Sequence, residues 1–143
     1  MQRVRTHSSG FCVFADFAAA AIRFADTYGK RVAILDIDVH HGDGTEILLK
    51  DRSDLFTFSI HEKGIFPGTG KVNESDKTNW IFNRPLNSGS GDFELQTAVQ
   101  DFVDAAQEFK PDVIMIAGGA DGHYSDPLAN LDYTEIGFAR AVR

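Results

Sequence analysis

Five side chains that can bind metal ions or transfer protons lie within one short segment of the sequence. Asp36, Asp38 and His40 are spaced at i, i+2 and i+4, and His41 and Asp43 follow. In an extended chain alternate side chains point the same way, so the first three can converge on one small volume. Carboxylates gathered so closely repel one another unless a cation lies among them. Because the set contains no thiolate, it favours a hydrolytic zinc or a harder divalent ion over a structural zinc.

Each of these residues also has an ordinary structural explanation. An Asp after a strand is commonly a turn or helix-capping residue, and a pair of loop histidines is often only solvated. The combination is less ordinary, because two acids and two imidazoles fall within six positions at the carboxyl end of an apolar run, where open α/β sheets build their sites. We therefore weigh three hypotheses: a metal-dependent hydrolase, a catalytically silent metal-binding or oligomerising protein, and a structural domain whose acids only cap turns.

A second apolar run ends in similar chemistry. Residues 112–117 contain the sequence Val-Ile-Met-Ile-Ala, and they are followed by two glycines, Asp121 and His123. An acid and an imidazole therefore follow this run, as they follow the apolar run of residues 32–35. Both segments favour a site at the carboxyl edge of one sheet.

The elements that would position these segments alternate between apolar runs and amphipathic patterns. We expect buried strands at residues 32–35, 55–60 and 112–117, and a short strand at 79–83. We expect a first helix from Asp16, as a possible N-cap, to about Tyr28, and a short second helix that follows a capping Thr45. Two further helices are expected, from Asp92 to about Phe109 and over 134–142. This alternation predicts a three-layer α/β/α fold with a mostly parallel sheet and helices on both faces.

Length and composition describe an ordinary globular chain. Its 143 residues are 43% hydrophobic and 24% charged, which predicts one domain with a sizeable core and argues against disorder. No stretch approaches the ~20 apolar residues of a membrane helix and no signal peptide opens the chain, so we expect no membrane contact and a cytoplasmic location. The single cysteine, Cys12, is expected to be a buried apolar residue. A net charge of −7 argues against direct binding of nucleic acid.

Four motifs, in the right order, carry a family resemblance. They are the Gly-Phe-Cys sequence at 10–12, the loop Asp-Ile-Asp-Val-His-His-Gly-Asp-Gly-Thr at 36–45, Phe-Pro-Gly-Thr-Gly at 66–70, and Gly-Ala-Asp at 119–121 up to Asp-Pro at 126–127. Together they resemble the zinc-dependent histone deacetylase family, which includes bacterial acetylpolyamine and acetoin-utilisation relatives. The resemblance implies the arginase/deacetylase-like fold and hydrolysis of C–N bonds other than peptide bonds, with acetylated lysine or polyamine as substrate.

The resemblance also implies roles for the acids and the imidazole. Asp38, His40 and Asp121 would be the zinc ligands, leaving an open position, which is the pattern of a catalytic zinc. Asp36 and Asp43 would be the carboxylates that orient the family's catalytic histidine pair.

Further residues match the family's substrate tunnel and its structural potassium site. Phe11 and Phe66 would line the tunnel that holds the acyl-lysine stem, with Gly10 on its wall. A potassium ion would be held largely by backbone oxygens of Asp36, Asp38, His40, Ser59 and Ile60.

Two expected elements have no match. The family's histidine pair would fall on Met1 and Gln2, and His7 lies too close to Gly10 to replace it. The family's tyrosine lies in a later glycine-rich loop, beyond Arg143. We therefore expect a central portion of a deacetylase that lacks amino-terminal and carboxy-terminal portions and is impaired or inactive. A sheet cut from a larger domain leaves apolar edges uncovered, so we also expect a homo-oligomer.

Overall fold

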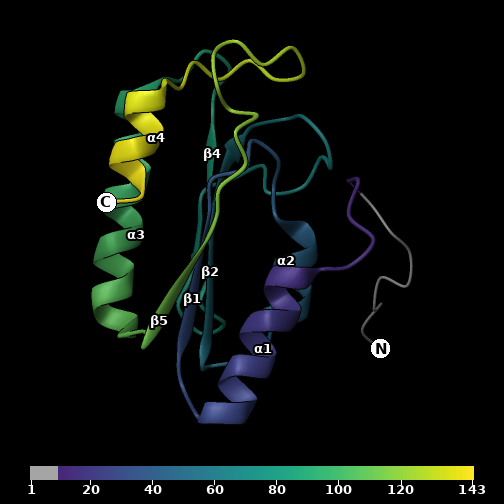
Figure 1. The fold of residues 1–143 in the computed structure, drawn as a ribbon, viewed down its shortest axis with the longest axis vertical. Helices are drawn as coiled ribbons and strands as arrows, with labels where there is room; N and C mark the ends of the chain where they lie inside the picture. Colours follow the sequence, from purple (N-terminus) through teal and green to yellow (C-terminus); the bar gives the residue numbers. More distant parts are fainter. Residues whose placement is uncertain (1–9) are drawn as a thin grey trace.

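A computed structural model describes residues 10–143, and its strands form one sheet between two layers of helices (Figure 1). In chain order the elements are α1 (Asp16–Tyr28), β1 (Val32–Asp36), α2 (Asp43–Leu49), β2 (Leu55–Glu62), β3 (Glu74–Asp76), β4 (Ile81–Leu86), α3 (Asp92–Phe109), β5 (Val113–Ala117) and α4 (Glu135–Ala141).

The sheet has five strands in the order β3-β4-β2-β1-β5. Strand β1 lies parallel to both β2 and β5, β2 lies parallel to β4, and only β3 runs antiparallel to its neighbour. Asp36 pairs in register with Ser59 of β2 on one side and with Ala117 of β5 on the other. The predicted fold class is therefore confirmed, and the carboxyl ends of β1, β2 and β5 meet at one edge.

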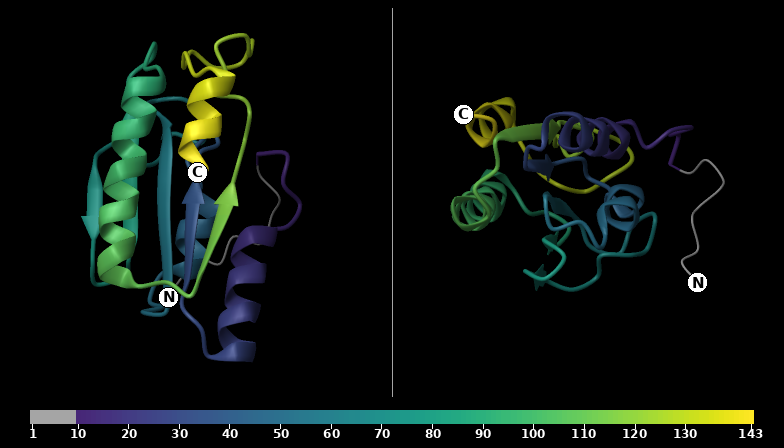
Figure 2. Two further views of the ribbon diagram at one scale, coloured as in Figure 1. Left: turned by 60° about the vertical axis from the view of Figure 1, so that its left-hand side comes forward. Right: turned by 90° about the horizontal axis from the view of Figure 1, so that it is seen from below.

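Helices cover both faces of the sheet, α1 and α2 on one side and α3 and α4 on the other (Figures 1 and 2). The α3 side buries an aromatic cluster centred on Phe56, whose ring contacts those of Phe58, Trp80, Phe82, Phe102 and Phe109. On the opposite side small alanines of α1, at 18, 21 and 25, pack close to β1. The sheet that carries the polar loops is thus held rigidly from both faces.

The two long helices follow the sequence pattern closely. Helix α1 begins at Asp16 itself, with Ala15 as N-cap, and ends at Gly29, whose φ of 62° is the left-handed conformation common after helices. Helix α3 begins where the Glu94 side chain accepts a hydrogen bond from the Gly91 N–H at 2.9 Å. It ends at Phe109, before Pro111, as the sequence predicts.

Several predicted boundaries were wrong. Helix α2 begins at Asp43 and not after a capping Thr45. Strand β2 continues two residues beyond 60, to Glu62, and β4 covers Ile81–Leu86 where we predicted 79–83. The short β3 was not predicted, because Glu74–Asp76 is polar and mostly exposed and carries no strand pattern.

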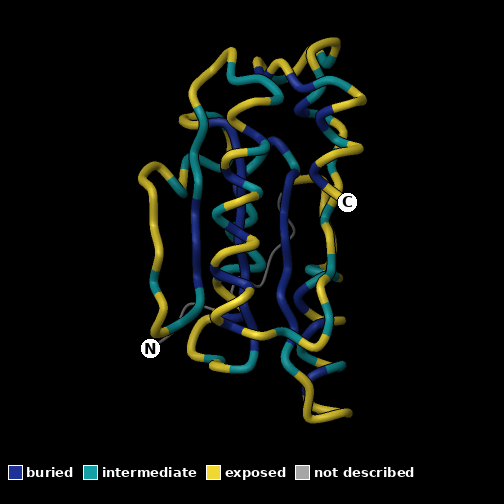
Figure 3. Tube along the Cα trace, turned by 90° about the vertical axis from the view of Figure 1, so that its left-hand side faces the viewer, coloured by how far each residue is buried: buried dark blue, intermediate teal, exposed yellow. Residues whose placement is uncertain are grey.

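Strand β5 was predicted to be buried but is an open edge. Its residues alternate between intermediate and exposed, with Ile114 at 50% and Ile116 at 37%, whereas β1 and β2 are buried throughout. Figure 3 shows the buried strands of the sheet in dark blue. Within residues 10–143 no strand pairs with the outer side of β5, and this explains the exposure.

Two smaller findings concern the chain outside the sheet. Cys12 is exposed and not buried as predicted, because the segment around it lies on the surface. In the part of the chain that the structure describes, no helix has the length and hydrophobicity needed to cross a membrane.

Candidate metal centre

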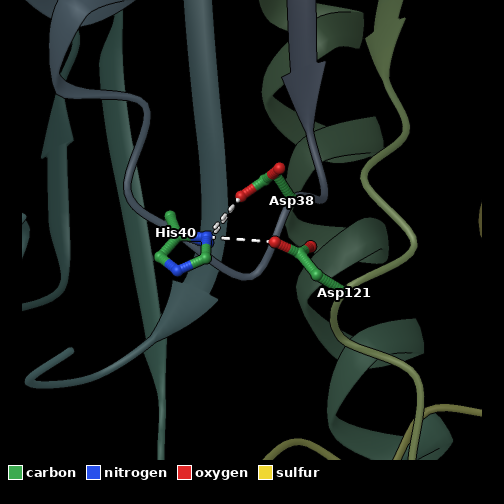
Figure 4. Close-up of side chains that lie close together, drawn as sticks. All are labelled: Asp38, His40 and Asp121. Atoms are coloured by element: carbon green, nitrogen blue, oxygen red, sulfur yellow. Dashed lines mark hydrogen bonds and ion pairs between the residues drawn. The ribbon is translucent and has the colours of Figure 1, made fainter. Parts of the chain in front are cut away.

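The ends of two neighbouring parallel strands bring three polar side chains together. Asp38 and His40 lie in the loop that follows β1, and Asp121 lies in the loop that follows β5. His40 Nδ1 is 3.1 Å from Asp38 Oδ1 and 3.0 Å from Asp121 Oδ2, as the dashed lines in Figure 4 mark. One ligand atom of each residue lies within 4.8 Å of the others.

Backbone hydrogen bonds fix each carboxylate. Asp38 Oδ1 accepts the N–H of His40 at 2.7 Å, and Asp121 Oδ1 accepts the N–H of Val39 at 3.0 Å. The Asp36 side chain accepts the N–H of Asp38 at 3.1 Å. The loop is therefore folded around its own acids, and Asp121 is tied to it across the sheet edge.

Burial makes two of the acids, Asp36 and Asp38, reluctant to ionise. It raises the pKa of Asp36 to about 7, despite the Asp38 N–H that opposes this change. Burial also raises the pKa of Asp38, and the neighbouring Asp121 carboxylate adds to that effect. A cation among the carboxylates would favour their charged forms. The donor set of two carboxylates and one imidazole, half open to solvent, fits a catalytic divalent ion such as zinc.

Two glycines let the backbone approach the acids closely. A methyl group at Gly119 would lie 2.4 Å from Asp38 Oδ2, and one at Gly42 would lie 2.4 Å from Asp36 Oδ2. Real side-chain carbons do not approach so closely. Glycine is therefore required at both positions if the acids are to keep their places.

The predicted tunnel residues border the same cavity, which has a volume of about 710 Å³. The Phe66 ring, 54% exposed, stands edge-on to His40 with 6.2 Å between centroids. A methyl group at Gly10 would lie 3.2 Å from Phe66 Cε1, so this glycine lies against the ring. Phe11 is fully exposed with φ of 60° and makes none of the ring contacts found in the described residues.

The remaining predicted residues lie in α2 and β2. Asp43 begins α2 and lines the cavity. Ser59 and Ile60 are buried in β2, next to the end of β1. The Ser59 hydroxyl lies 3.0 Å from His61 Nδ1 and accepts the Gly42 N–H at 3.3 Å. Met1, Gln2 and His7, the positions considered for a histidine pair, lie outside the described residues.

The sequence placed His41 only among the polar side chains of its loop and gave no reason to single out His61, yet both imidazoles contact residues 69–70, at the end of the segment 66–70 that carries Phe66. His41 and His61 are buried, and their rings lie 4.6 Å apart. Both hydrogen-bond to the end of that segment, at Thr69 and Gly70. The available signal was the alternation of Ser59 and His61 along one strand, which places both side chains on the same face.

Comparison with known sequences agrees with the motifs. A family profile described as the histone deacetylase domain matches residues 4–143. Histone deacetylase 14, chloroplastic, of Arabidopsis thaliana is 45% identical over 130 residues, which are 87% of this chain and 31% of the relative. Acetoin utilization protein AcuC of Bacillus subtilis is 40% identical over 136 residues, 91% of this chain and 35% of that protein. The chain spans about a third of the length of these relatives.

Solved structures share the fold. The acetylpolyamine aminohydrolase from Burkholderia pseudomallei aligns with a TM-score of 0.83 and 28% identity, over 93% of this chain and 40% of that one. A histone deacetylase homologue complexed with SAHA aligns with a TM-score of 0.85 and 25% identity, over 94% of this chain and 38% of that one.

Proposed function

The chain belongs to the histone deacetylase family, and from this premise we propose that its site is that of a zinc-dependent amidohydrolase of acetylated lysine or acetylated polyamine, with impaired turnover in this chain. One observation carries the proposal: an open cluster of Asp38, His40 and Asp121 lies beside the exposed Phe66 ring in one cavity. The relatives support the substrate class, since one is an acetylpolyamine aminohydrolase and others are histone deacetylases.

In this proposal Asp38, His40 and Asp121 hold the metal. When bound, a zinc ion with three protein ligands and an open position polarises a carbonyl and acidifies water. The chain's own contribution is to fix the donors in advance, through the hydrogen bonds from the His40 and Val39 N–H groups. Asp36 supports the turn through the Asp38 N–H. Zinc remains the ion of choice, and a harder divalent ion is its alternative.

The apolar stem of the substrate would lie along Phe66. The ring is exposed toward the cavity and is held between Gly10 and His40. An aromatic wall beside a small polar cluster suits a ligand with an amide head and an aliphatic stem. Phe11 and Leu128, exposed at the same cavity, offer further apolar surface.

A potassium ion near Asp36, Asp38, His40, Ser59 and Ile60 stays a prediction. Its support is the register pairing of Asp36 with Ser59 in adjacent strands. Homo-oligomerisation also stays a prediction, supported by the exposed edge of β5. The cytoplasmic location is untested, and the Arabidopsis relative carries the name of a chloroplast protein.

A second candidate, metal and ligand binding with little turnover, is favoured by the imidazoles at the cavity. Among the described residues only His40 and His41 supply imidazoles there, and no tyrosine lines it. His40 is a proposed metal ligand, and both nitrogens of His41 are hydrogen-bonded to Thr69 and Glu46. The site in residues 10–143 therefore lacks an unoccupied imidazole to move a proton.

Ligand binding tests the proposal independently of turnover. We expect zinc-loaded protein to bind octanohydroxamate, a metal-binding head on an alkyl stem, in isothermal titration calorimetry. Binding should disappear without zinc and in Asp38→Ala. The matched control is Asp16→Asn, because Asp16 lines the same cavity but lies outside the ligand cluster. Equal binding by zinc-free protein or by Asp38→Ala would contradict the proposal.

A further inference from the structure

Two buried imidazoles hold the end of the segment that carries Phe66. His41 follows β1 and His61 lies in β2, and their side chains meet beneath Thr69 and Gly70. His61 is 1% exposed and His41 is 6% exposed. Buried imidazoles that hydrogen-bond through both nitrogens fix their partners in place and permit few alternative geometries.

The hydrogen bonds of His61 run in one direction. Its Nε2 lies 2.8 Å from the Gly70 carbonyl oxygen, which can only accept, so Nε2 carries the proton. Its Nδ1 then accepts from the Ser59 hydroxyl at 3.0 Å. The Ser59 oxygen in turn accepts the Gly42 N–H at 3.3 Å. A continuous chain of hydrogen bonds thus links the loop after β1 to Gly70.

His41 makes a second connection of the same kind. Its Nε2 lies 3.0 Å from Glu46 Oε2, and this carboxylate fixes the proton on Nε2. Its Nδ1 hydrogen-bonds with the Thr69 hydroxyl at 2.8 Å. Glu46 is itself held by the Asn83 side-chain amide at 2.9 Å. Thr69 is thus anchored through His41 to α2 and β4.

Gly70 is pressed directly against both rings. Its φ is 62°, and a methyl group there would lie 2.5 Å from His61 Nε2 and 2.7 Å from His41 Cδ2. Only a glycine can place the backbone so close to the two imidazoles. The position of the segment at 69–70 is therefore defined by the rings.

The position of residues 69–70 in turn determines the position of Phe66. A hydrogen bond of 2.8 Å from the Gly68 N–H to the Ile65 carbonyl closes a tight turn around Phe66. Because the turn is closed, a shift at Thr69 or Gly70 moves Phe66 with it. The ring would then lose its place beside His40 and Gly10.

We propose that His41 and His61 are positioning residues that set the Phe66 wall relative to the metal ligands, and so set the affinity of the site for the aliphatic stem of its ligand. The inference rests on the proposed function. Neither ring hydrogen-bonds to the side chains of Asp38, His40 or Asp121 in the described structure. The proposal therefore assigns the two imidazoles to the aliphatic stem and leaves the metal-binding head to Asp38, His40 and Asp121.

A pair of probes separates the stem from the head. Acetohydroxamate binds through its metal-binding group alone, whereas octanohydroxamate adds an alkyl stem that would lie against Phe66. The Kd of acetohydroxamate divided by the Kd of octanohydroxamate, both measured on zinc-loaded protein, gives the contribution of the Phe66 wall to affinity. We expect His61→Leu to reduce this ratio about tenfold, which corresponds to the loss of roughly 50 Å² of apolar contact. The Kd of acetohydroxamate and the zinc content should not change.

Further variants guard against a general loss of folding. Thr69→Val removes the hydroxyl that binds His41 at an exposed position, and it should reduce the ratio in the same direction. His61→Gln keeps an N–H that can reach the Gly70 carbonyl, and it should retain most of the ratio. Leu55→Val is the matched control, because Leu55 lies at the start of β2 in the core on the α1 side, and Ile65 packs against the other core cluster.

The outcomes are distinguishable. A wild-type ratio in both His61→Leu and Thr69→Val would overturn the inference while leaving the proposed function intact. The same loss of ratio in Leu55→Val would also overturn it, because general destabilisation would then explain the effect. Wild-type protein that binds zinc but gains nothing from the stem would overturn the proposed function, and the inference with it.

Discussion

Gly118 and Gly119, at the end of β5, form a matched pair of substitution sites. A methyl group at Gly119 would lie 2.8 Å from Asp38 Cα, whereas one at Gly118 would meet nothing within 4 Å. Neither glycine has a positive φ, so alanine adds no backbone strain at either position. Carbon atoms pack comfortably at about 3.5 Å, so Gly119→Ala must displace the Asp38 backbone by about 0.7 Å.

This displacement can be converted into an expected loss of metal affinity. Metal–ligand distances are held within about 0.2 Å, several times less than the shift that Gly119→Ala demands. Changes beside metal ligands typically reduce affinity about 10- to 100-fold, or about 1.4 to 2.7 kcal/mol. We expect a loss of this size for Gly119→Ala and wild-type affinity for Gly118→Ala.

Competition with a chromophoric zinc chelator measures the two affinities. Urea unfolding of the zinc-free proteins shows whether both variants fold to the same extent. Equal zinc affinities for the two alanine variants would refute the reasoning, because they would show that Asp38 does not hold the metal or that its position does not matter.

The remaining predictions concern stability, assembly and turnover. Burial lowers the pKa of His61 from 6.5 to about 4. As the pH falls from 6.5 to 4, His61 is protonated in the unfolded chain but not in the folded one, so the free energy of unfolding decreases by up to about 3 kcal/mol. Urea unfolding of the zinc-free wild type and of His61→Gln measures this effect as the difference between their free energies of unfolding, which should change with pH. The opposite contribution of Asp36 is present in both proteins and cancels in the difference. A difference that does not vary with pH contradicts the prediction. The exposed edge of β5 should cause self-association at micromolar concentration, which Ile116→Lys should reduce in light scattering, whereas a monodisperse wild-type monomer would be evidence against it. Turnover of a fluorogenic acetyl-lysine peptide should remain near the Asp38→Ala blank, because the site in residues 10–143 lacks an unoccupied imidazole and a positioned acid or base contributes about 10² to 10⁴ in rate. Activity well above the blank would show that another group supplies the acid or base.

The sequence predicts those parts of the fold that depend on local patterns. Helix α3 was predicted with its observed limits because apolar residues recur at helical spacing and Pro111 follows. The approach of Asp121 to the loop after β1 follows from the family resemblance and the parallel arrangement of β1 and β5. These features need only periodicity, strand direction and the order of the motifs.

Features that depend on distant partners were not predictable in the same way. Pro85 gives no local sign of a strand, yet it lies in β4, which β3 covers only at residues 81–83, so the missing N–H of the proline is tolerated at an open edge. The apolar sequence of β5 suggested burial, but its exposure depends on whether a neighbouring strand exists. The link between His61 and Gly70 requires a turn whose path no local pattern specifies.

Zinc content tests the central claim most directly. After zinc loading and removal of free metal, elemental analysis should find about one zinc per wild-type chain. The double variant Asp38→Ala with Asp121→Ala should retain none, while Asp16→Asn should match the wild type. Equal zinc content in the wild type and the double variant would contradict the assignment of the cluster as the metal site.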